Sequence, residues 1–364
     1  MCGLYKHLPM HGSKGPARGY NHDMHVWSLF LRCAALFLAL AAAPHARAAV
    51  PMDERQALHL LSRLGYGPAP GEVARVRATG AHAWVDSQLA PPPLPPYLAM
   101  RLRELADAHA PPGEAVLLLA IASPRQLEEV LANFWLGWFS AGQAVDADAL
   151  RDALRPHVFD RYQDLAGQAR ARGLRLPVGG EHAALRALAR HFVDAPPPAM
   201  LRTLARVWDA SGGDQRAVLR QLLTSRAFLA PAQWNSRRKD DFRFVASAVR
   251  ASGVWVEYVA PLGEYLRQPM GRGEREAFVE RLADGGFSLG RAPPQPQRYA
   301  SSAPPMRATV TPDASQGMVS QPGPALMEAP TPSAIARAAA EARSVPADPE
   351  RLRILLRSAD FQRY

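Results

Sequence analysis

Cysteine is almost absent from this 364-residue sequence, which contains only Cys2 and Cys33. Both lie before Ala48, after which we expect a signal peptide to be cleaved, so the mature chain has no thiol for a disulfide or for nucleophilic chemistry. A lipoprotein is excluded as well, because its cysteine would have to stand at the cleavage point, and Cys33 lies inside the preceding apolar run.

A long hydrophobic run is also missing, and the one apolar stretch near the start is typical of a Sec-type signal peptide. Within Met24–Ala48, Arg32 closes a weakly basic region, Cys33–Ala43 is apolar, and Ala46-Arg47-Ala48 supplies small residues for cleavage. The alternative is a buried or membrane-spanning helix, but the run is far shorter than the roughly 20 residues that span a bilayer. We therefore expect a periplasmic or secreted protein that is not integral to the membrane after cleavage, with either Met1 or Met24 as its start.

Positive charge exceeds negative charge only modestly once the signal peptide is removed. The whole chain has a formal net charge of +10, and cleavage removes five basic side chains and one acidic side chain, which leaves +6. The arginines are dispersed rather than gathered in a basic stripe, which argues against a nucleic-acid-binding protein. The same charge is compatible with attraction to anionic polymers of the cell envelope.

Residue patterns for metal or phosphate binding are missing too. After Ala48 no two histidines lie three or four residues apart, as two ligands of one metal on a helix would. The glycine pairs mark turns and lack the spacing of a phosphate-binding loop. We therefore expect no cofactor, no metal, and a structural or surface role for the histidines, which are His59, His82, His109, His157, His182 and His191.

His157 and Asp160 are the candidates for acid–base catalysis that the sequence offers. They lie one turn apart if their segment is helical, and a carboxylate so placed holds an imidazole in one tautomer and raises its basicity. Arg155 and Arg161 flank the pair, so a surface network linked by arginine explains the same residues without catalysis. Both interpretations stay open from the sequence alone.

Apolar residues recur at helical spacing, and strand signals are almost absent from the first half of the chain. Residues 181–231 predict three helices, separated by a proline run and by a Gly212-Gly213 turn, with Asp214 as the N-cap of the third. Upstream, we expect Ser123 to cap a long helix with Pro124 at its first position. The sequence therefore predicts an all-α fold, an irregular multi-helix domain. We expect its helical tryptophans (84, 135, 138 and 208) to pack in the core rather than to stack on a bound sugar.

The C-terminal part predicts a short basic turn, a linker and two closing helices. Arg237-Arg238-Lys239 should be the solvated start of a helix that Asp240 caps. We expect residues 1–48 as an extension and signal peptide, 49–285 as the helical domain, 286–332 as a disordered Pro/Ser/Ala-rich linker, and 333–364 as helices that pack back on the domain. Packing is suggested because Leu352–Ser358 followed by Phe361 resembles Leu219–Ser225 followed by Phe228.

Six segments, spread in order over most of the mature chain, carry a common pattern. They are His59–Pro68 (HLLSRLGYGP), the helix with Phe134-Trp135, Leu154–Phe159, Ala189–Asp194, Leu222–Ser225 and Leu355–Gln362. Together they resemble the exported bacterial family called DUF1800. The resemblance implies a mainly helical, exported protein whose biochemical activity is not established.

The sequence departs from that family pattern in two places. The aromatic helix usually carries an Asn-His pair where this chain has Gly137 and Trp138, and a long block rich in Asn, Glu and His is reduced here to Asp164–Glu181. If the chemistry of the family lies in that polar block, this chain has lost it. The resemblance therefore implies a shortened, divergent member, more in keeping with a degenerate or regulatory relative than with an active one.

These observations favour a protein without catalytic activity that acts as an interaction or scaffold partner of another exported protein. Two alternatives remain: an envelope hydrolase acting on a polymer through the region of His157 and Asp160, and a binder of anionic polysaccharide. A pocket with converging polar groups would favour the enzyme, and an exposed apolar patch would favour the interaction role. A continuous basic groove would favour polysaccharide binding.

Overall fold

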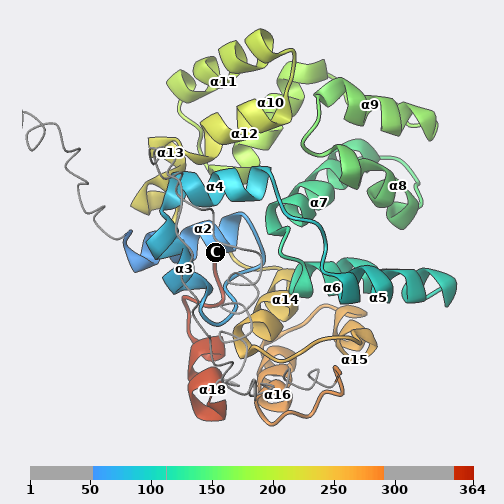
Figure 1. Cartoon of the computed structure of the whole chain (residues 1–364), viewed down its shortest axis with the longest axis vertical. Helices are drawn as coiled ribbons and strands as arrows, with labels where there is room; N and C mark the ends of the chain where they lie inside the picture. The colour runs from blue at the N-terminus through green and yellow to red at the C-terminus, as the bar shows by residue number, and fades with distance from the viewer. Residues whose placement is uncertain (1–51, 112, 291–347) are drawn as a thin grey trace, which may run out of the picture. The chain divides into compact units, whose positions relative to one another are not determined.

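The computed structural model describes residues 52–111, 113–290 and 348–364, and within them it contains helices and two isolated β-bridges but no strand (Figure 1). The predicted all-α fold is therefore confirmed. These residues belong to one unit, 51–364. The α-helices are α2 (Glu54–Arg63), α3 (Glu72–Thr79), α4 (Ala81–Leu89), α5 (Pro96–Asp107), α6 (Glu114–Ala122), α7 (Gln126–Ser140), α8 (Ala147–Leu154), α9 (Tyr162–Ala171), α10 (Gly180–Phe192), α11 (Pro198–Ser211), α12 (Gln215–Leu223), α13 (Arg226–Leu229), α14 (Asp241–Ser252), α15 (Ala260–Gly263), α16 (Arg272–Ala283) and α18 (Pro349–Arg357).

Several sequence-based predictions lie outside the described residues. These are the signal peptide, most of the 286–332 linker and the first closing helix at 333–343. In the part of the chain that is described, no helix is both long enough and apolar enough to cross a bilayer.

The three helices predicted between 181 and 231 are present as α10, α11 and α12. Asp214 caps α12 as expected, because its Oδ1 accepts a hydrogen bond from the Ala217 amide at 3.0 Å. Gly212 ends α11 with a φ of 63°, in the left-handed region that glycine tolerates. Local sequence signals therefore set the ends of these helices.

The predicted start of α7 is wrong by two residues. The helix begins at Gln126, and Ser123 accepts a hydrogen bond from the Arg125 amide instead of capping a helix at Pro124. The reason is the Gln126 side chain, which binds the carbonyls of Ala120 and Ser123 at 3.1 and 2.8 Å and accepts from the Tyr66 amide at 3.0 Å. A contact to a distant segment therefore decides where this helix starts.

Helices α7 and α14 form the centre of the fold. Helix α7 contacts α4, α6, α8 and α10, while α14 contacts α6, α16 and α18. Every side chain from Arg243 to Arg250 on α14 is buried. On α7, Trp135 is fully buried and stacks on Phe139 with ring centroids 5.9 Å apart. The prediction of core tryptophans is thus confirmed for Trp135 and Trp208, whereas Trp84 and Trp138 are only partly buried.

Residues 348–364 are the described part of the predicted closing segment 333–364. Helix α18 lies beside α16 and contacts α16 and α14 (Figure 1). The Phe361 ring packs edge-on against Phe244, with ring centroids 6.2 Å apart. The similarity to the α12–α13 segment is structural as well. Ser358 accepts a hydrogen bond from the Phe361 amide at 3.1 Å, and Ser225 accepts one from the Phe228 amide at 3.2 Å.

Two predictions near the C-terminal part need correction. Lys239 is buried rather than solvated, because its ammonium lies 3.5 Å from the centroid of the Phe361 ring, and its pKa falls to about 7 through burial and the neighbouring Arg243 and Arg275 charges. Phe287 and Leu289, assigned to the linker, are buried. The Leu289 carbonyl also accepts hydrogen bonds from the amides of residues 257 and 258, so the packed domain extends to residue 290.

A buried ion cluster joins α7 to α8. Glu129 on α7 pairs with Arg151 on α8 at 2.5 Å, and these side chains are 0% and 2% exposed. The second oxygen of Glu129 pairs with Arg155 at 2.6 Å. Such a cluster is stable only while each charge keeps its partner, because an isolated ion in this environment is strongly disfavoured.

Replacement of Glu129 by alanine should lower the free energy of unfolding by about 3–5 kcal/mol, because Arg151 and Arg155 lose their buried counter-ion. Urea denaturation measures the change. The control is Asp86→Ala, which removes the partner of Arg220 in a pair whose side chains are 51% and 55% exposed. That variant should lose no more than about 1 kcal/mol. Equal losses in the two variants would contradict this account of α7 and α8.

Candidate binding pocket

A pocket of about 480 Å³ opens where α7, the end of α10, the start of α14 and the last residue of the chain meet. Five aromatic side chains line it, and they come from four separate segments of the chain, because two of them lie on α7. They are Tyr66, Phe134, Trp138, Phe242 and Tyr364. The size is within the range of small-ligand and side-chain pockets, and the aromatic wall favours apolar or aromatic groups.

Most polar groups of the pocket are already bonded within the protein. The Arg243 guanidinium donates to the carbonyls of Ser62 and Gly65 at 3.2 and 2.9 Å. Asn133 donates to the Tyr66 hydroxyl at 2.6 Å and accepts from Arg151. These contacts build the wall and leave the groups little capacity to act on a ligand.

Asp240, also in the pocket wall, uses a carboxylate oxygen to cap α14, where it accepts from the Arg243 amide at 2.7 Å. The Tyr66 hydroxyl is held neutral, because burial raises its pKa to about 12. Neither group is therefore arranged as an acid or a base for catalysis at neutral pH.

His191 is a polar side chain of the wall for which the described residues supply no hydrogen-bond partner. Its ring packs against Phe134 and Phe192, each at a centroid distance of 4.9 Å. Burial, followed by the positive charges of Arg243, Arg237 and Arg63, lowers its pKa to about 3. The imidazole is thus neutral at pH 7, free to bond to a ligand but a poor proton acceptor.

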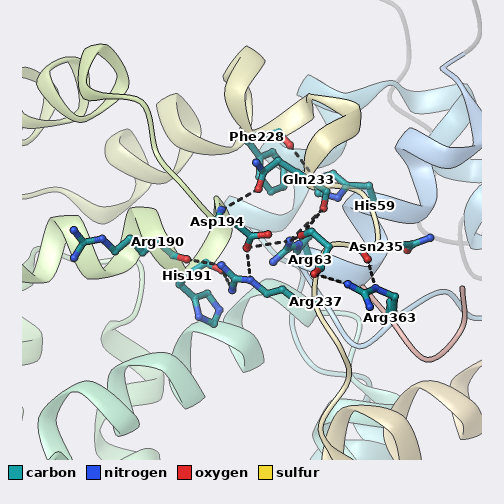
Figure 2. A network of polar contacts seen from close by, with 11 residues as sticks. His59, Arg63, Arg190, His191, Asp194, Phe228, Gln233, Asn235, Arg237 and Arg363 are labelled. Atoms are coloured by element: carbon teal, nitrogen blue, oxygen red, sulfur yellow. Dashed lines mark hydrogen bonds and ion pairs between the residues drawn. The ribbon is translucent and has the colours of Figure 1, made fainter. Parts of the chain in front are cut away.

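A polar network beside the pocket fixes the end of α10 on which His191 lies (Figure 2). Arg237 donates to the last-turn carbonyls of Arg190 and His191 at 2.6 and 2.7 Å, and it pairs with Asp194. A guanidinium in that position satisfies the free carbonyls at a helix C-terminus and complements the helix dipole. The sequence-based prediction that residues 237–239 are merely a solvated turn is therefore wrong for Arg237 as well.

Arg63 connects the same network to α2 and to the chain end (Figure 2). Its side chain is 1% exposed and donates to the Gln233 carbonyl at 3.2 Å and the Ser236 hydroxyl at 2.5 Å. The guanidinium also lies 5.1 Å from the centroid of the Tyr364 ring, with Arg243 4.3 Å from the same ring. Two arginines thus hold in place the tyrosine that completes the pocket.

The pair predicted as an acid–base candidate is formed, but it lies outside this pocket. His157 Nδ1 is 3.0 Å from Asp160 Oδ2, and Arg216 lies 3.6 Å from the other carboxylate oxygen. Both side chains are about one third exposed, at 33% and 39%. The arginine near the pair is Arg216, because Arg155 is bound to Glu128 and Glu129.

One sequence match to a hydrolase motif was missed by the sequence analysis. Gly286–Gly290 reads Gly-Phe-Ser-Leu-Gly, the pattern of a serine nucleophile on a strand-to-helix turn. Here the segment follows α16, has no strand before it within the described residues, and leaves Ser288 exposed. No hydrogen bond of a described histidine reaches Ser288, so the match does not form a nucleophile elbow. Among the described residues, no group of three or more His, Cys, Asp or Glu side chains could hold a metal ion.

Comparison with known proteins gives one family match, which covers most of the described chain. A family model described as a protein of unknown function (DUF1800) matches residues 59–172 and 182–363. The interruption, residues 173–181, covers the loop after α9 and the first two residues of α10. No curated protein and no solved structure matched the chain.

His59, under the network, should make stability depend on pH. Its Nε2 donates to the Phe228 carbonyl at 2.9 Å, and burial followed by the Arg63 charge lowers its pKa from 6.5 to about 4. At pH values between about 4 and 6.5, His59 binds a proton in the unfolded chain but not in the folded chain. The free energy of unfolding therefore falls as the pH is lowered through this range. His59 alone should lower the free energy of unfolding by about 2–3 kcal/mol between pH 7 and 4.5.

Urea denaturation at the two pH values measures this effect. His59→Gln keeps a donor for the Phe228 carbonyl but cannot titrate, so it should lose less stability than the wild type on acidification. The control is His82→Gln on the exposed side of α4, which should keep the wild-type pH dependence. The same pH dependence in all three proteins would exclude His59 as the titrating group.

Proposed function

Because the chain belongs to the DUF1800 family, we propose that it is an exported protein without catalytic activity that binds another exported protein through its aromatic pocket. The observation that carries this proposal is the composition of the pocket wall. Five aromatic side chains line a pocket of about 480 Å³, and the neutral imidazole of His191 in its wall has no hydrogen-bond partner among the described residues. Such a site suits an aromatic or apolar side chain that anchors a partner protein.

The departures from the family pattern support the same proposal. Gly137 and Trp138 stand where the resemblance implies an Asn-His pair, and both residues line the pocket. An asparagine and a histidine there would add hydrogen-bonding and proton-transfer groups to the wall. In this chain the same positions supply open space and an indole ring, which favour binding over chemistry.

An exposed apolar patch between α5 and the loop after α14 also supports an interaction role. Tyr97 and Trp255 pack together with ring centroids 4.6 Å apart, and Arg101 covers Tyr258 at 4.3 Å. Met100 and Tyr258 are 52% and 48% exposed. Aromatic residues and arginine dominate the energetic centres of protein interfaces.

The alternative of an envelope hydrolase is favoured by the 3.0 Å contact between His157 and Asp160. However, neither residue lines the aromatic pocket or the other pocket described for this chain, which lies between α16 and α18. Polysaccharide binding through scattered arginines is weakened because Arg63, Arg237, Arg243 and Arg250 bond to carbonyl groups inside the fold. Their charges are therefore committed to the protein itself.

A pull-down from envelope extract with the tagged mature protein tests the proposal, with bound proteins identified by mass spectrometry after a high-salt wash. Gly137→Leu should abolish capture of the partner, because it adds a side chain at the pocket wall where a Cβ meets no atom within 4 Å. The protein should remain folded and gain roughly 0.5–1 kcal/mol, because leucine replaces glycine inside a helix.

The matched control is Gly167→Leu on α9, where a Cβ also meets no atom within 4 Å but the site is outside the pocket. It should capture the partner as the wild type does. Undiminished capture by Gly137→Leu would show that the pocket is not the binding site. Turnover of an envelope polymer by the wild type, lost in His157→Ala, would favour the hydrolase instead.

A further inference from the structure

The aromatic wall of the pocket is accessible to a ligand over most of its rings. Tyr66 is buried, but the other four aromatic residues are half-buried, namely Phe134, Trp138, Phe242 and Tyr364. These four rings border a volume of about 480 Å³, which is large enough for a planar aromatic group. The kind of aromatic group that fits then depends on the charges and hydrogen-bonding groups in the wall.

An aromatic pocket commonly binds a cation, but here the protein supplies its own cations to the rings. The Arg243 guanidinium lies 5.1 Å from the centroid of the Tyr66 ring and 4.3 Å from that of Tyr364. Arg63 lies 5.1 Å from the same Tyr364 ring. Cation–π attraction needs a ring face that no other cation occupies, and Arg243 has no carboxylate partner among the described residues. A cationic ligand would therefore be placed beside an uncompensated guanidinium.

The charges around His191 act in the same direction. After burial, the charges of Arg243, Arg237 and Arg63 all lower the pKa of its imidazole. The carboxylate in the wall is that of Asp240, which is exposed and lies at the N-terminus of α14, where the helix dipole offsets its charge. The pocket therefore disfavours a positive group and suits a neutral one that carries an electronegative oxygen.

His191 provides a hydrogen-bonding site for such an oxygen. Asn133, Asp240 and Arg243 in the same wall are bonded within the protein. His191, by contrast, is half-buried, and neither of its ring nitrogens is sealed from solvent. A neutral imidazole has one donor and one acceptor nitrogen, so a hydroxyl group can bond to it in either tautomer. A purely apolar ring would remove water from these nitrogens without replacing its hydrogen bond.

We propose that the pocket is specific for a phenol group, presented as a tyrosine side chain of the partner protein. The phenol ring would pack among Phe134, Trp138 and Phe242, and its hydroxyl would bond to His191. A phenylalanine would leave the imidazole unpaired, and a lysine or arginine would meet the guanidinium charges. This inference rests on the proposed function, because it specifies the residue by which the partner is anchored.

NMR titration of the full mature chain with small probes tests the specificity without a partner. The probes are p-cresol, the tyrosine side chain; toluene, the phenylalanine side chain; and benzyltrimethylammonium, which carries a fixed positive charge. We expect p-cresol to bind about tenfold more tightly than either of the others. N-acetyltyrosinamide should bind at least as tightly as p-cresol. Gly137→Leu should abolish p-cresol binding, and Gly167→Leu should retain it.

His191→Phe tests the role of the imidazole. The new ring keeps the packing against Phe134 and Phe192 but has no nitrogen, so p-cresol and toluene should bind within about twofold of each other. Unchanged toluene affinity shows that the pocket of this variant is still formed. The matched control is His182→Phe on the same helix, where the side chain is 59% exposed, and it should keep the tenfold preference.

Equal affinities of p-cresol and toluene for the wild type, or binding of benzyltrimethylammonium as tight as that of p-cresol, would overturn the proposal. Binding of p-cresol without binding of N-acetyltyrosinamide would overturn it too, because the pocket would then take a free phenol rather than a side chain. The pull-down fails separately. Capture of a partner that Gly137→Leu abolishes, without a preference for p-cresol, would support the proposed function and refute the tyrosine anchor.

Discussion

The fold depends on guanidinium groups that bind the C-terminal carbonyls of helices. Arg243 donates to the carbonyls after α2, Arg250 donates to Ile121 in the last turn of α6, and Arg237 does the same for α10. Helices shorter than about 15 residues leave a large share of their carbonyls unpaired, and here several of these ends are buried. Buried guanidinium groups therefore replace the water molecules that would otherwise donate hydrogen bonds to these carbonyls.

The same arrangement explains why the pocket lies where it does. Arg243 and Arg237 lie beside His191 because each is fixed to a helix end, and burial together with their charges lowers the pKa of its imidazole and keeps it neutral. Tyr66 follows α2, Phe134 and Trp138 project from α7, and Tyr364 is clamped between two arginines. The arginines that bind the helix ends therefore also position the aromatic wall, so the contacts that stabilise the fold are the ones that shape the pocket.

The sequence could predict features that neighbouring residues determine. The caps at Asp214 and Asp240, the end of α11 at Gly212 and the core position of Trp135 follow from local spacing. The start of α7 could not be predicted, because the Gln126 side chain reaches the amide of Tyr66 across 60 residues. Likewise, His191 and Lys239 resemble surface residues until Arg243 and Phe361 are brought against them by the fold. The pocket could not be predicted from the segments that carry the family resemblance, because nothing in the sequence shows that they lie close together in the fold.

The docking of residues 348–364 has a consequence for any ligand of the aromatic pocket. This segment acts as an intramolecular ligand of the domain. Its backbone forms hydrogen bonds with that of residues 237–239, and its covalent connection to the domain runs through residues 291–347. Because the segment and the domain belong to one chain, the fraction of molecules in which the segment is docked does not depend on the protein concentration. Because Tyr364 completes the wall only while the segment is seated, the apparent affinity of the pocket scales with the population of that state.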